Sequence, residues 1–97
     1  MFARMSSQLV GMDNKLDFTR FRELLQRLEN TGVTIRFRQL GNPWSSFCQL
    51  ILLSESAMIL QESNDRKIIM NLRNVVEFEV SETVAEFKAN QTYEIEY

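Results

Sequence analysis

The chain is 97 residues long, carries a net charge of −2 and contains one cysteine and no histidine. A chain of this length forms one domain with a modest core, and its slight negative charge argues against general nucleic-acid binding. The lack of histidine removes the commonest general base and metal ligand, and no apolar run approaches the ~20 residues of a membrane span. We expect a cytoplasmic domain that is not an enzyme, needs no cofactor or metal, and crosses no membrane.

Domain organisation is simple. Residues 1–14 show no clear hydrophobic period, and we expect them to form a loose N-terminal segment before a single domain over residues 15–97. The first 12 residues also lack the continuous apolar stretch of a secretory signal, so export is not expected. Basic residues dominate 15–38 and acidic residues dominate 39–97, a division that either marks a binding face or neutralises itself within the fold.

The clearest element is an amphipathic helix over about residues 18–30. Its apolar residues recur on one stripe with a period of 3.6, and they are Phe18, Phe21, Leu24, Leu25 and Leu28. Asp17 suits the N-cap, because its carboxylate can accept from the free N–H groups of the first turn. Gly32 suits a left-handed residue that ends the helix.

The rest of the chain consists of short apolar or alternating segments joined by polar turns. The segments predicted as strands are 33–38, 47–53, 57–61, 67–72, 76–80 and 93–97, and residues 47–53 are apolar on both faces. Connections this short favour antiparallel neighbours. The sequence therefore predicts an α+β fold, in which one N-terminal helix precedes five or six short antiparallel strands that form a small curled sheet or a barrel.

In its order of elements, and in the rhythm of AMILQESNDRKIIMNLRNVVEFEV, the chain resembles the Sm-like barrels over residues 17–80. The resemblance implies a helix followed by five bent strands. The glycines and polar RNA-contacting residues that this family carries around its strand turns have no counterpart here, so the resemblance does not extend to RNA binding. A pleckstrin-like barrel shares the rhythm but places its helix at the end of the chain. No family is assigned.

Few residues have catalytic potential. Cys48 lies in an apolar segment with no histidine to activate it, which predicts a buried and unreactive thiol. Glu77 and Glu79, like Glu94 and Glu96, are two residues apart and could bind a cation or act as acid and base. Alternation on a solvent-exposed strand produces the same spacing without any function. We therefore predict no catalytic, cofactor-binding or metal-binding residue.

Four residues form a candidate binding surface, and they are Arg36, Arg38, Trp44 and Arg73. Arg36 and Arg38 share one strand face, where they could bind phosphate or carboxylate, or pair across strands with one of the two glutamate pairs. Trp44 follows a proline in a loop, where it could stack on a ligand or base, anchor a protein partner, or cover the end of the core.

We favour a function in protein–protein contact or self-association, since one helix cannot cover both apolar faces of residues 47–53. Tyr93, Ile95 and Tyr97 alternate at the end of the chain, where we expect an edge strand, and they are the candidate interface of a symmetric dimer. Glu94 and Glu96 could instead protect that edge from pairing. The alternative function is a barrel of Sm-like type that binds nucleic acid through the four residues of the candidate binding surface.

Overall fold

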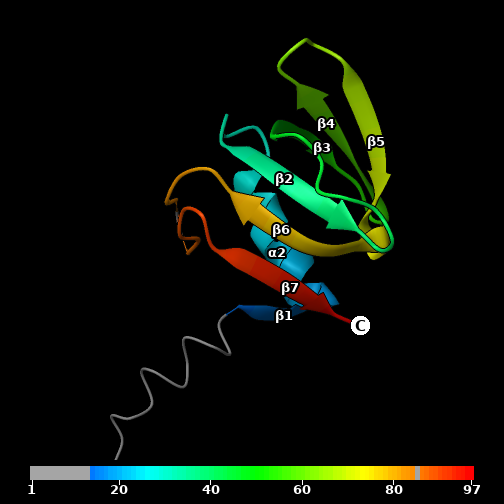
Figure 1. Cartoon of the computed structure of the whole chain (residues 1–97), viewed down its shortest axis with the longest axis vertical. Coiled ribbons are helices and arrows are strands. Elements are labelled where there is room, and N and C mark those ends of the chain that lie inside the picture. The colour runs from blue at the N-terminus through cyan, green and yellow to red at the C-terminus, as the bar shows by residue number, and fades with distance from the viewer. Residues whose placement is uncertain (1–13, 85) are drawn as a thin grey trace, which may run out of the picture.

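The computed structural model describes residues 14–84 and 86–97, which contain one α-helix and one seven-stranded sheet (Figure 1). The strands are β1 (Lys15–Asp17), β2 (Thr34–Gln39), β3 (Cys48–Leu53), β4 (Ala57–Glu62), β5 (Lys67–Asn71), β6 (Val75–Val80) and β7 (Thr92–Glu96). The helix is α2 (Phe18–Leu28), and a short 3₁₀ turn, η1 (Leu72–Asn74), joins β5 to β6. The predicted loose segment 1–14 lies outside the described residues, apart from Asn14, whose carbonyl accepts from the N–H of Glu94 at 2.7 Å.

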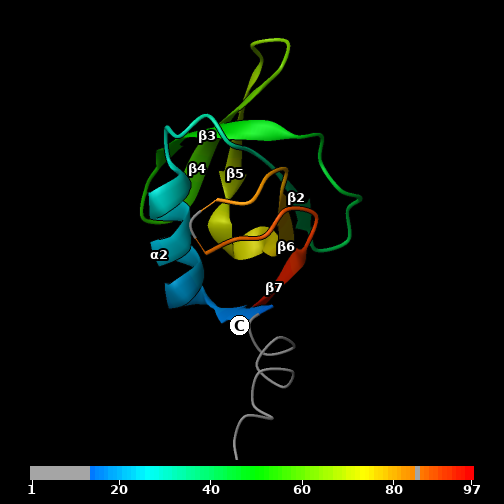
Figure 2. The same ribbon diagram turned by 90° about the vertical axis from the view of Figure 1, so that its left-hand side faces the viewer.

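The strands lie in the order β1-β7-β6-β2-β3-β4-β5, and the sheet is not closed. It curls, with α2 lying along one side (Figure 2), so the curled sheet is correct and the barrel is not. The α+β class is confirmed, but the sheet has seven strands instead of five or six, and β1 precedes the helix. β1 is also parallel to β7, whereas all other neighbours are antiparallel. In the part of the chain that is described, no helix is long and apolar enough to cross a membrane.

The helix begins where its sequence predicts. The carboxylate of Asp17 accepts from the N–H of Arg20 at 2.7 Å, which confirms the N-cap. The helix ends at Leu28, two residues before the predicted end, because Glu29 turns to extended geometry and its carboxylate accepts from the N–H of Leu53 at 2.7 Å. Asn30, with φ 60°, reaches the left-handed region before Gly32 does, so Gly32 is not the residue that ends the helix.

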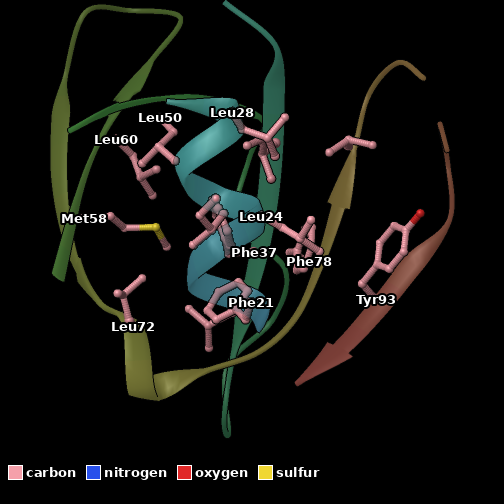
Figure 3. Packing of buried hydrophobic residues seen from close by; sticks show 14 of the residues in the cluster. Phe21, Leu24, Leu28, Phe37, Leu50, Met58, Leu60, Leu72, Phe78 and Tyr93 are labelled. Atoms are coloured by element: carbon pink, nitrogen blue, oxygen red, sulfur yellow. The ribbon is translucent and has the colours of Figure 1, made fainter. Parts of the chain in front are cut away.

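The core lies between the buried stripe of α2 and the inner face of the sheet (Figure 3). Phe78 of β6 is fully buried near its centre, and its ring contacts the rings of four aromatic residues from other parts of the chain. The centroid distances are 5.5 Å to Phe21, 6.2 Å to Phe37, 5.5 Å to Phe87 and 5.2 Å to Tyr93. Helix, sheet and C-terminal segment therefore share one aromatic cluster.

This cluster corrects the predicted dimer interface. Tyr93 and Ile95 are only 4% and 7% exposed, so they belong to the core. β7 lies between β6 and β1, and the premise that it forms a sheet edge is therefore wrong. Tyr97 is exposed, but its ring packs against Phe18, with centroids 5.9 Å apart. The sequence could not show this, because the strand that covers β7 comes from the other end of the domain.

Candidate functional site

The outer face of the sheet carries a charged ladder across β2 and β6. The strand register places Arg36 opposite Glu79 and Arg38 opposite Glu77. Nε and Nη2 of Arg36 donate to one oxygen of Glu79 at 3.0 and 2.6 Å, and Nε of Arg38 donates to Glu77. The cross-strand pairing that the sequence allowed is therefore present, with the first glutamate pair. An anionic ligand would have to compete with carboxylates that both arginines already bind.

Trp44 lies over this ladder and not over the end of the core. The loop after β2 folds back along the strand, because the N–H of Ser45 donates to the carbonyl of Phe37 at 2.8 Å. The folded-back loop places Trp44 in an isolated antiparallel β-bridge with Arg38. The guanidinium of Arg36 lies 4.8 Å from the Trp44 ring centroid. A cation–π contact of this kind contributes about 0.5–1 kcal/mol at exposed sites. The half-buried indole of Trp44 therefore helps to hold in place the side chain of Arg36, which already pairs with Glu79.

Arg73 is not part of this group. Its guanidinium lies 4.0 Å from the ring centroid of Phe18, at the start of α2. Together with Arg22, Glu23 and Glu55 it lines an open groove of about 790 Å³ beside the helix. Two arginines and two glutamates leave this groove without a net charge. The structure brings together Arg36, Arg38 and Trp44 of the candidate surface, but separates Arg73 from them.

Cys48 is buried, as its sequence context predicts. Its Sγ donates to the carbonyl of Ile35 at 3.2 Å. Burial, and to a smaller extent the charge of Glu62, raises the pKa of the thiol to about 11. The protonated form therefore dominates at neutral pH, and the reactive thiolate is suppressed.

Metal ligation finds no support in residues 14–84 and 86–97, where no three histidine, cysteine, aspartate or glutamate side chains converge. Comparison of the chain with protein-family models, with curated proteins and with solved structures finds no match.

An apolar row on the outer face was not identified from the sequence. Leu52 of β3 lies opposite Ile59 of β4, which lies opposite Ile69 of β5. Leu52 is 50% exposed and Ile69 is 76% exposed. The outer face of residues 47–53 is therefore left open at Leu52, as expected for a strand whose two apolar faces cannot both be covered by one helix. The signal was present in KIIMN, where Ile68 and Met70 face the core and Ile69 must point outward.

The same strand ends the sheet. The N–H of Leu72, just after β5, donates to the carbonyl of Ser56 at 3.0 Å. Hydrogen-bonded residues alternate along an antiparallel pair, so Lys67, Ile69 and Asn71 direct their N–H and C=O groups away from β4. Beyond them the sheet has no further strand in the described part of the chain. We call these three residues the β5 edge.

Proposed function

We propose that this domain is a non-enzymatic protein-interaction domain that binds an extended polypeptide segment by strand addition at the β5 edge. The observation that carries the proposal is the coincidence, on one strand, of outward-facing backbone groups and the most exposed large apolar side chain of the sheet, that of Ile69. An added strand satisfies the open N–H and C=O groups, which supplies affinity, while side-chain contacts supply specificity.

The sequence and register of β5 favour pairing with a further strand, because β5 lacks the features that commonly protect a sheet edge from such pairing. Sheet edges are commonly protected by proline, by a bulge or by charges within the strand. The register of β5 with β4 is continuous from Lys67 to Asn71, and the strand contains no proline and only one charged residue, at its first position. The apolar row of Leu52, Ile59 and Ile69 adds side-chain contact for an incoming strand on the outer face.

Nucleic-acid binding remains the alternative proposal, with less support. Arg36 and Arg38 are paired with glutamates, and Arg73 lies beside the helix instead of beside them. Only the exposed side of Trp44 is left for a base. A cytoplasmic location is part of the proposal, because an unpaired, buried Cys48 suits a reducing compartment.

The test is a titration of isotope-labelled domain with synthetic peptides of about nine residues in which β-branched and polar residues alternate. We expect binding, with NMR shift changes concentrated at residues 67–71. Ile69→Pro should abolish it, because proline removes the outward N–H and is tolerated only where that group is not bonded within the sheet. Ile69→Val keeps the N–H and serves as the matched control.

Two results would contradict the proposal. One is equal binding by the wild type and by Ile69→Pro, because the outward N–H would then be irrelevant. The other is the absence of binding by any peptide together with retention of a single-stranded oligonucleotide, which would favour the alternative through Arg36, Arg38 and Trp44.

A further inference from the structure

We propose that the strand added at the β5 edge is β5 of a second copy of this chain, paired antiparallel about a two-fold axis at Ile69. This inference rests on the proposed function of the edge and names its partner. It transfers the self-association that the sequence suggested from β7, which is covered, to β5, which is open.

The backbone selects the register. With the axis at Ile69, this residue lies opposite its own copy, and Lys67 lies opposite Asn71 of the partner subunit. Residues that face each other in a hydrogen-bonded antiparallel pair exchange both of their backbone bonds, so every group of the β5 edge finds a partner. Any other two-fold register pairs fewer of these residues, and one centred on Lys67 places two like charges face to face.

The side chains agree with this register. Ile59 lies beside Ile69 on the outer face, and Leu52 lies beside Ile59. Pairing at Ile69 makes this apolar row continuous with the same row of the second subunit. The side chain that loses most exposure is then Ile69, which is 76% exposed in the single chain. Burial of such a row is the main favourable term in association.

Charge supports an antiparallel copy in particular. Asp65 precedes β5 and Arg73 follows it, and both are exposed. The start of one strand meets the end of the other in this arrangement, so Asp65 approaches Arg73 of the partner subunit at both ends of the interface. Among the described residues neither takes part in an ion pair within the chain, because Asp65 accepts from the amide of Gln61 and Arg73 lies over Phe18.

The register can be tested with a pair of cysteine variants. Residues opposite each other in a hydrogen-bonded antiparallel pair have Cα atoms about 5.5 Å apart, which a disulfide can span. Ile69→Cys should therefore form a covalent dimer under mild oxidation. Lys67→Cys is the matched control, since the copies of residue 67 would lie about 13 Å apart along the strands. The native Cys48 is buried and should not react. Equal cross-linking of the two variants, or none by Ile69→Cys, would contradict the register.

A mixing experiment tests the partner itself. The wild type should sediment at twice the 11.4 kDa of one chain at high micromolar concentration. Asp65→Arg alone and Arg73→Asp alone place like charges at both ends of the interface, and each should weaken association about tenfold or more. An equal mixture should associate again, because the heterodimer restores an opposite pair at each end. Circular dichroism on each variant checks that it is folded.

Each outcome of the mixing experiment decides between self-association and another partner. A wild type that stays monomeric at about 500 µM, or variants that do not associate on mixing, would overturn the second copy as partner. If the wild type nevertheless binds peptides and Ile69→Pro does not, the proposed function survives, with a different chain as the partner. If peptide binding also fails, both proposals are removed together.

Discussion

Arg36 and Glu79 face each other across β2 and β6, and two N–H groups of the guanidinium donate to one oxygen of the carboxylate, at 3.0 and 2.6 Å. Glu79 is 8% exposed, and it is the buried charged residue of the described chain. The carboxylate of Glu79 is shielded from water. Without Arg36, nothing would offset the free-energy cost of burying its charge.

We therefore predict that Arg36→Met destabilises the domain by about 1–3 kcal/mol, since it leaves Glu79 buried and unpaired. Arg38→Met is the matched control, because Glu77 is more exposed than Glu79 and water can replace the lost arginine. This control should cost less than about 1 kcal/mol. Urea denaturation measures both free energies of unfolding, and equal effects of the two variants would show that the burial of Glu79 is unimportant.

The helix provides a second prediction. Leu24 is 3% exposed and lies in the buried stripe of α2, so Leu24→Ala should cost about 2–5 kcal/mol through lost burial and the cavity left behind. Gln26→Ala, on the exposed face of the same helix, should change stability by less than about 0.5 kcal/mol. A loss below about 0.5 kcal/mol for Leu24→Ala in chemical denaturation would mean that α2 does not pack on the sheet.

A third prediction concerns the N-cap. Asp17→Ala should destabilise the domain by about 0.5–2 kcal/mol, because the N–H of Arg20 loses its acceptor. Asp17→Asn retains a side-chain oxygen at the same position and should cost much less. Thermal or chemical denaturation compares the two. Similar losses in both variants would point to the charge of Asp17, and not to its capping hydrogen bond, as the stabilising feature.

Cys48 provides a prediction about pH. Its pKa is raised from the ordinary 9.0 to about 11 in the fold, so between these values the folded protein keeps a proton that the unfolded chain has lost. Stability from this group is present below about pH 9 and falls as pH rises toward 11. Denaturation of the wild type should show a steeper decline over this range than Cys48→Ala, in which the group is absent. Parallel declines would contradict the raised pKa.

The same burial controls thiol chemistry. A thiol reagent should label native Cys48 slowly at neutral pH and quickly once denaturant unfolds the chain, because both access and thiolate formation are suppressed in the fold. The unfolded chain is the internal control for reagent activity. Rapid labelling of the native protein would reopen a role for Cys48 in catalysis.

The sequence by itself determined the local elements. The stripe of α2, its cap at Asp17, the strand alternation and the buried Cys48 follow from periods and neighbours within a few residues. It also identified Arg36, Arg38 and Trp44, which do lie together, and it offered the pairing with Glu77 and Glu79 that the structure contains. These features could be predicted from the sequence because each depends on the geometry of one short segment, or on charges that alternate along it.

Only the tertiary structure decided which strands lie at the edges. Lys15 pairs with Glu94, so the ends of the domain meet, and a three-residue strand too short to show any period covers the edge of β7. Tyr93 is buried against Phe78 and Phe87, which come from other parts of the chain. The strand order makes β5, which pairs only with β4, the edge at the opposite end of the sheet from β1, with Ile69 exposed. Strand order is a long-range property, because a strand of the same alternating pattern can lie in the middle of a sheet or at its edge.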